Sequence, residues 1–157
     1  MQLCKIPIVT LATTIAASMA WAGAAPPGHT HRHDIYSAGE AGDPKKPARE
    51  INIEMREMEY LPSKIEVKRG EQIKFIIRNS GSEAHEFLLA TTEENLKHGA
   101  AMRKNPAMEH DDPNGIHLGA KKTGEILWKF TKAGTFEYSC LIPDHREYGM
   151  IGTVVVK

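Results

Sequence analysis

The amino-acid sequence predicts an all-β fold, a Greek-key β-sandwich or small barrel with one inserted helix-loop segment and a flexible N-terminal arm. Two observations predict this fold. From Ile51 onward, short segments alternate apolar and polar residues, and Gly, Pro and Asn turns separate them. The pattern breaks over residues 91–122, where helix-forming residues and a loop take its place.

The expected strands follow one another in chain order. In the first, Ile51, Ile53 and Met55 alternate with polar residues, and Ile65 and Val67 do the same in the second. The remaining strand segments are "EQIKFIIRN" (71–79), "HEFLLA" (85–90), "GEILWKF" (124–130), "GTFEYSC" (134–140) and "IGTVVVK" (151–157). The stretch 51–157 is long enough for one compact domain.

The interruption contains one expected helix. Thr91 and Glu94 have the spacing of a capping box, and "TEENLKHGAAMRK" (92–104) continues from it and stops before Pro106. The segment "NPAMEHDDPNG" (105–115) is rich in turn residues, and we expect a loop there.

The N-terminus has the features of a secretory signal. Lys5 precedes an apolar stretch from Ile6 to Ala20, and Ala20-Trp21-Ala22 fits the rule for cleavage after Ala22. The stretch is short for a membrane span and rich in Thr, Ser and Ala, which disfavours the alternative of a permanent anchor. We therefore expect residues 1–22 to be removed, a periplasmic location and no stable membrane insertion afterwards.

Residues 23–50 are rich in Gly, Pro, Ala and charge and lack an apolar period, which predicts a flexible arm. His29, His31 and His33 alternate within it and form a possible loose site for additional copper. The whole chain carries 20 basic and 20 acidic residues. This balance gives no reason to expect nucleic acid or an anionic membrane surface as a partner.

Export changes the interpretation of Cys140. With Cys4 removed in the signal, Cys140 is the remaining cysteine in an oxidising compartment, so no intrachain disulfide can form. An exposed thiol there would be prone to oxidation. Two interpretations are open: an inert buried cysteine, or a thiolate occupied by a metal.

Four side chains suggest the metal. Cys140 closes an expected strand, His145 lies on the following loop, and Met150 opens the last strand. His85 opens another strand after a turn, and in a sandwich that strand can lie beside the Cys140 strand. Two imidazoles, a thiolate and a weak thioether are the ligand set of a mononuclear type 1 copper centre. Zinc is the rival, but structural zinc sites take a fourth Cys, His or carboxylate rather than Met.

These residues resemble the cupredoxin family in the N-x5-H spacing from Asn79 to His85 and in the spacing C-x4-H-x4-M. The segment "YSCLIPDHREYGMIGTVVV" (138–156) is closest to the ligand loops of rusticyanin and auracyanin. The resemblance covers residues 51–157. It implies one copper ion bound by His85, Cys140 and His145, with Met150 as axial ligand.

The sequence departs from the family pattern at two positions. Asp144 stands where rusticyanin-like loops commonly have Gly, and Glu86 follows the first His where other cupredoxins often carry Asn or Asp. Both lie next to expected ligands, so they bear on colour and reduction potential more than on metal binding.

The same residues argue against an enzyme. A binuclear copper centre needs a second Cys near the first, and copper oxidases and nitrite reductases place His next to the type 1 Cys. Here the neighbours of Cys140 are Ser139 and Leu141. We therefore expect a non-enzymatic protein.

Two roles remain open. The first is copper tolerance or handling; the alternative is a soluble one-electron carrier of a respiratory or photosynthetic chain, which would need a redox partner protein. The first is favoured by additional His and Met residues, more than an electron shuttle requires. These residues are Met55, Met58, His98, Met102, Met108, His110 and His117, besides the three arm histidines. The arrangement resembles periplasmic cupredoxins associated with copper tolerance.

Overall fold

The computed structural model describes residues 36–104 and 112–157, and the structural statements below concern those residues. The expected signal, the arm up to residue 35 with His29, His31 and His33, and the loop residues 105–111 lie outside the described ranges. In the part of the chain that is described, no helix is both long enough and apolar enough to cross a membrane.

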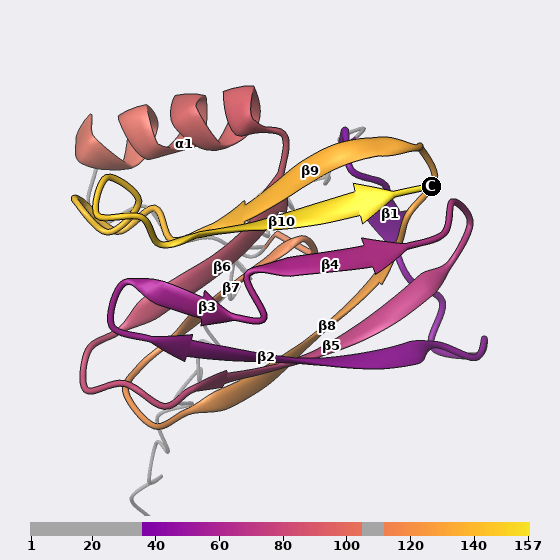
Figure 1. Cartoon of the computed structure of the whole chain (residues 1–157), viewed down its shortest axis with the longest axis horizontal. Coiled ribbons are helices and arrows are strands. Elements are labelled where there is room, and N and C mark those ends of the chain that lie inside the picture. Colours follow the sequence, from indigo (N-terminus) through magenta and orange to yellow (C-terminus); the bar gives the residue numbers. More distant parts are fainter. Residues whose placement is uncertain (1–35, 105–111) are drawn as a thin grey trace, which may run out of the picture. The chain divides into compact units, whose positions relative to one another are not determined.

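The described residues form two five-stranded sheets and one helix (Figure 1). The first sheet has the order β1 (Glu40–Ala41), β8 (Thr123–Lys129), β5 (Gln72–Asn79), β2 (Arg49–Arg56) and β3 (Glu59–Leu61). The second has the order β4 (Lys64–Val67), β10 (Ile151–Val156), β9 (Gly134–Ser139), β6 (His85–Ala90) and β7 (Gly115–Leu118). The helix, α1 (Thr92–Lys104), connects the β6 strand to the segment before β7.

Both sheets are mixed. The pairs β2–β5 and β4–β10 are parallel, whereas the other neighbouring strands are antiparallel. The antiparallel β6–β9 pair has Leu88 opposite Ser139, so the beginning of β6 and the end of β9 lie at the same end of the sheet. This register confirms that the strand opened by His85 lies beside the strand closed by Cys140.

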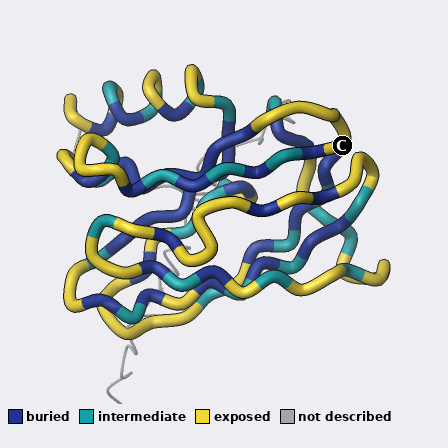
Figure 2. Tube along the Cα trace, in the orientation of Figure 1, coloured by how far each residue is buried: buried dark blue, intermediate teal, exposed yellow. Residues whose placement is uncertain are grey.

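The core lies between the two sheets. Phe75 of the first sheet contacts Phe87 of the second, with ring centroids 5.4 Å apart, and Tyr60 stands edge-on to Tyr138 at 5.1 Å. Figure 2 shows buried residues recurring along the strands where these faces meet. Burying each large apolar side chain stabilises the folded state by about 1.5–3 kcal/mol. The aromatic rings that meet between the two sheets therefore form a stable frame.

The sandwich with an inserted helix that the sequence predicts is therefore confirmed. The predicted strands are present with ends shifted by a residue or two, and the helix spans the predicted residues. The capping box also forms, because the Thr91 hydroxyl accepts from the Glu94 N–H at 3.2 Å while the Glu94 carboxylate accepts from the Thr91 N–H at 2.8 Å.

Three short strands, β1, β3 and β7, were not predicted. With two to four residues each, they are too short to produce an alternating pattern that can be recognised. The strand β1 also differs from the expectation of a flexible arm over 23–50. Ala38 is fully buried, Tyr36 packs edge-on against Trp128 at 5.5 Å and β1 pairs with β8, so residues 36–41 pack on the rest of the domain.

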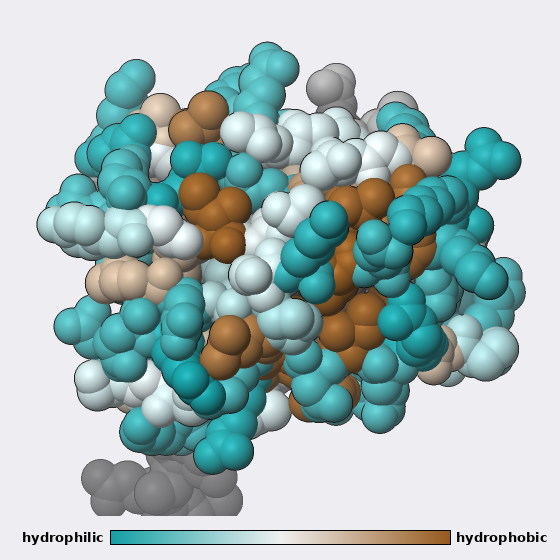
Figure 3. All heavy atoms as spheres, in the orientation of Figure 1, coloured by the Kyte–Doolittle hydropathy of each residue, from teal (hydrophilic) through white to brown (hydrophobic). Residues whose placement is uncertain are grey.

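The outer surface in the view of Figure 3 is a mosaic, with hydrophobic patches separated by hydrophilic side chains. Among the described residues, the large hydrophobic side chains that are exposed are Leu61, Leu96 and Tyr148. Tyr148 belongs to the loop between β9 and β10, which also carries His145.

Candidate metal centre

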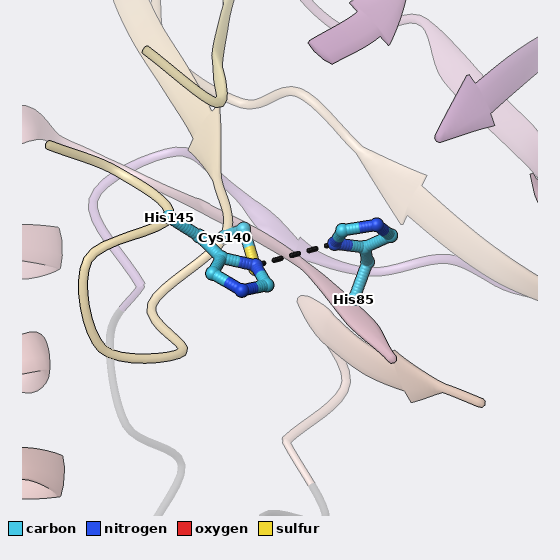
Figure 4. A group of neighbouring side chains, drawn as sticks. All are labelled: His85, Cys140 and His145. Carbon is cyan, nitrogen blue, oxygen red and sulfur yellow. Dashed lines mark hydrogen bonds between the residues drawn. The ribbon is translucent and has the colours of Figure 1, made fainter. Parts of the chain in front are cut away.

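Three donor atoms converge where β6 begins and β9 ends. The Nδ1 atom of His145 lies 3.3 Å from the Sγ of Cys140 and 3.3 Å from the Nδ1 of His85. One ligand atom from each residue lies within 4.8 Å of the other two, and all three residues are buried. In Figure 4 the two imidazoles approach each other with the Cys140 sulfur beside the His145 ring.

A hairpin-like loop between β9 and β10 holds two of these residues. The Cys140 N–H donates to the Met150 carbonyl at 3.2 Å, and the Met150 N–H donates to the His145 carbonyl at 3.1 Å. The His145 N–H in turn donates to the Ile142 carbonyl at 3.1 Å. These bonds fix the loop on two paired strands, so His145 is positioned by backbone bonds rather than by side-chain packing alone.

Met150, the fourth expected ligand, is fully buried at the base of this loop. Its backbone is bonded to both Cys140 and His145, which places it in the same buried region. The structure thus brings His85, Cys140 and His145 together through their donor atoms and Met150 next to two of them through its backbone.

Two loop residues adopt the left-handed backbone region. Asp144 has a φ of 74° and Gly149 a φ of 102°. The first value explains the departure noted in the sequence, because a position with positive φ is normally suited to Gly. Asp is among the residues that tolerate this region best, so the loop keeps its conformation without the glycine.

The turn before His85 is held by Asn79. Its side-chain amide donates to the carbonyls of Glu83 at 2.7 Å and Leu118 at 3.0 Å, while its oxygen accepts from the Gly81 N–H at 3.0 Å. Asn79 is fully buried, so these bonds satisfy an amide group whose burial without hydrogen-bond partners would destabilise the fold. The Asn-x5-His spacing therefore has a physical reason, because Asn79 holds the turn that positions His85.

The Cys140 sulfur is enclosed. Burial raises the pKa of its thiol to about 11, although the backbone N–H groups of Glu86 and Ile142 act in the opposite direction. The Glu86 N–H donates to Sγ at 3.3 Å. Hydrogen bonds of this kind stabilise a thiolate and tune a bound metal once the proton has left.

The two histidines have different surroundings. Burial, followed by the positive charge of His145, lowers the pKa of His85, which favours the neutral imidazole that binds metals. Within the described residues, the buried Nε2 of His85 has no hydrogen-bond partner. The Nε2 of His145 instead faces the Glu83 carboxylate at 3.8 Å.

A buried ion pair that sequence reasoning missed ties the loop to the helix. Arg146 donates to both carboxylate oxygens of Glu137 at 2.9 Å, and Glu137 also accepts from the side chains of Asn95 at 3.1 Å and Thr92 at 3.0 Å. Nothing in the sequence indicated this pair, because Glu137 stands at a polar position of the alternating segment "GTFEYSC". The residue after His145 is thereby fixed to both β9 and α1.

The donor set fits copper. Two nitrogens 3.3 Å apart can share one ion, because metal–nitrogen bonds are about 2.0–2.1 Å. A thiolate with two imidazoles suits copper in both oxidation states. The cluster found among the described residues contains no carboxylate that would complete a zinc site. The next soft donor is Met150, whose backbone is bonded to both Cys140 and His145.

A β-sandwich with a buried His-Cys-His cluster at one end is the arrangement of a type 1 copper protein. The chain belongs to the plastocyanin/azurin family of copper-binding proteins, whose family model matches residues 47–157. Copper is accordingly its cofactor, and the family resemblance stated from the sequence is confirmed.

Curated relatives carry the name copper-resistant cuproprotein CopI. The protein from Rubrivivax gelatinosus is 44% identical over 129 residues, covering 81% of this chain and 78% of that protein. The one from Pseudomonas aeruginosa is 30% identical over 148 residues, covering 76% and 82%.

Among solved structures, auracyanin B superposes with a TM-score of 0.64 at 19% identity, covering 76% of this chain and 96% of that one. Auracyanin from Roseiflexus castenholzii gives a TM-score of 0.60 at 19% identity, covering 71% and 99%. At this identity the likeness establishes the fold alone.

Proposed function

We propose that this protein is an exported, non-enzymatic type 1 copper protein that serves copper tolerance in the periplasm. His85, Cys140 and His145 hold one copper ion, and Met150 is the weak axial ligand. The convergence of the three donor atoms inside the protein is the observation that carries this proposal.

The arrangement of the metal-free residues supports the assignment. The His145 Nδ1 lies 3.3 Å from both the His85 Nδ1 and the Cys140 Sγ, and hydrogen bonds alone cannot use all of the lone pairs of these three atoms. A cation between them satisfies all three, and copper bound there supplies a reversible change between Cu(I) and Cu(II). The sheet-held loop and the buried Arg146–Glu137 pair keep the donors in place during that change, so little reorganisation is required.

Copper tolerance is favoured over electron transport by the relatives. Both CopI proteins are named for copper resistance, and each is matched over about three quarters or more of its length. We further propose that residues 1–22 direct export, that the arm expected over 23–50 ends where Tyr36 begins to pack on the domain, and that His29, His31 and His33 bind additional copper loosely. N-terminal sequencing of the periplasmic protein is expected to begin at Gly23; an intact N-terminus would contradict the export proposal.

The ligand assignment is tested by Cys140→Ser in the copper-loaded protein. The intense visible absorption of thiolate-to-copper charge transfer is expected to disappear, because the serine oxygen cannot replace a soft thiolate. Substituting His29, His31 and His33 together is the control and is expected to leave the band unchanged. A band that persists in Cys140→Ser would show that another residue binds the copper.

A further inference from the structure

Glu86 is a buried acidic residue between the two segments that supply the candidate copper ligands. It follows His85 on β6, and only 7% of the residue is exposed. Glutamate is rarely buried to this degree unless its carboxylate has a partner. The type 1 assignment uses the neighbouring His85 and gives this carboxylate no role.

The backbone of Glu86 is fixed against the sulfur of Cys140. Its N–H donates to the Cys140 Sγ at 3.3 Å. Its carbonyl accepts a hydrogen bond from the hydroxyl of Tyr60, which is itself buried. Because both backbone groups are held, the side chain starts from a defined position next to the donor cluster.

The Glu86 carboxylate contacts the second ligand segment. Its Oε2 accepts from the N–H of Leu141, the residue after Cys140, at 3.2 Å. One residue of β6 is therefore bonded to two successive residues of the loop between β9 and β10. The side chain is only 9% exposed, so little water screens the charge of the carboxylate at the edge of the donor cluster.

The ion pair that the described residues give Glu86 is with a histidine, not with a lysine or an arginine. Its Oε1 lies 3.7 Å from the Nδ1 of His117, its direct partner in the β6–β7 pair. That side chain is 56% exposed, and it carries a charge only when protonated. Glu137, another buried carboxylate that supports this loop, is instead bonded through both oxygens to the permanently charged Arg146.

We propose that the Glu86 carboxylate sets the oxidation-state preference of the copper centre and favours Cu(II) over Cu(I), an inference that rests on the proposed function. A negative charge attracts a doubly charged ion more strongly than a singly charged one, and the difference grows where water is excluded. Groups bonded to the ligands rather than to the metal tune a metal centre in this way. A neutral residue at position 86 therefore gives a centre with a higher reduction potential.

The test is a redox titration of the copper-loaded protein, followed at the visible thiolate band, in the wild type and in Glu86→Gln. Glutamine keeps an oxygen for the Leu141 N–H and leaves the backbone bond to Cys140 in place, so the substitution removes the charge. The potential is expected to rise by about 59 mV, which is a tenfold shift of binding preference toward Cu(I) for a one-electron couple. Glu86→Asn is the second neutral variant, with a residue that other cupredoxins often carry there, and its potential is expected to rise as well.

Glu147→Gln is the matched control, because it removes one negative charge from the same loop at a side chain that is 55% exposed and paired with Arg103. Its binding preference is expected to change by less than about twofold, since water and salt screen an exposed charge. Neutral variants at position 86 that shift the potential no more than this control would overturn the inference and leave the type 1 assignment intact. A copper-loaded wild type without the thiolate band would instead contradict the proposed function.

Discussion

At the scale of single residues, Cys140 combines two opposing requirements. Its sulfur is fully buried, which favours the neutral thiol, whereas a metal ligand has to be a thiolate. The backbone N–H groups of Glu86 and Ile142 offset the effect of burial only in part, and two imidazoles lie next to the sulfur. Copper binding and loss of the thiol proton are therefore coupled.

This coupling predicts a pH dependence of copper affinity. The Cys140 pKa of about 11 means that the metal-free protein holds the thiol proton at neutral pH, and the lowered pKa of His85 means that its imidazole is already neutral there. Binding then releases the Cys140 proton, so the apparent affinity is expected to rise about tenfold per pH unit between about pH 7 and 8. Competition titrations against a chelator of known proton affinity measure the copper affinity at each pH.

The metal-free protein provides an independent check. Because the folded pKa lies above the unfolded value of about 8.5, the protonated thiol stabilises the fold below about pH 8.5. That contribution is lost as the pH rises toward about 11. The free energy of unfolding of Cys140→Ser, measured with denaturant, should not show this loss at high pH. A copper affinity that does not change with pH would mean that the thiolate already exists without metal.

At the scale of elements, α1 fixes the ligand loop in place. The helix contributes Asn95 and Thr92 to the buried Glu137 carboxylate that also holds Arg146, and Met102 packs with Leu141 and Leu88 in a small apolar cluster. Gly99 faces Leu141, where an added Cβ would lie 3.7 Å from its side chain. The inserted segment is thus part of the metal centre's support.

Substituting Glu137→Gln tests this support. Removing the carboxylate leaves the Arg146 guanidinium, 18% exposed, without its charged partner, and we expect a loss of about 3 kcal/mol in the free energy of unfolding. The matched control is Glu147→Gln, which breaks the exposed Arg103–Glu147 pair between the same helix and loop. That change should cost less than about 1 kcal/mol, and equal losses in both variants would contradict a special role for the buried pair.

The sequence was informative where chemistry is local. The spacing of Cys140, His145 and Met150 and the family resemblance were enough to single out Cys140, His145 and His85, whose donor atoms converge in the structure, while Met150 stays a prediction as a ligand. The helix α1 was predicted by its capping box. The Glu137–Arg146 pair and the Glu86–His117 contact could not be predicted, because each depends on which strands and loops become neighbours. The strands β1, β3 and β7 could not be predicted for the same reason, because their few residues form strands only by pairing with neighbouring strands.

At the scale of the whole molecule, the chain carries equal numbers of acidic and basic residues and the viewed surface is a mosaic. Neither feature indicates strong electrostatic steering toward a charged redox partner. A role in which copper itself is the partner agrees better with the His85–Cys140–His145 cluster and with the CopI relatives.

This role predicts the phenotype of a strain that lacks the gene. Growth should become sensitive to added copper while respiration without added copper stays normal, because the protein handles the ion rather than carrying electrons along a chain. The wild-type gene should restore tolerance and the Cys140→Ser gene should not. A respiratory defect with unchanged copper tolerance would favour the electron-carrier alternative.

The central claim is that one copper ion binds between side chains delivered by two distant segments. An X-ray structure of the copper-loaded protein, with anomalous data collected at the copper edge, tests it most directly. The account predicts an anomalous peak bonded to the Nδ1 atoms of His85 and His145 and to the Sγ of Cys140. A copper peak elsewhere, with the His85 ring turned away from that sulfur, would contradict it.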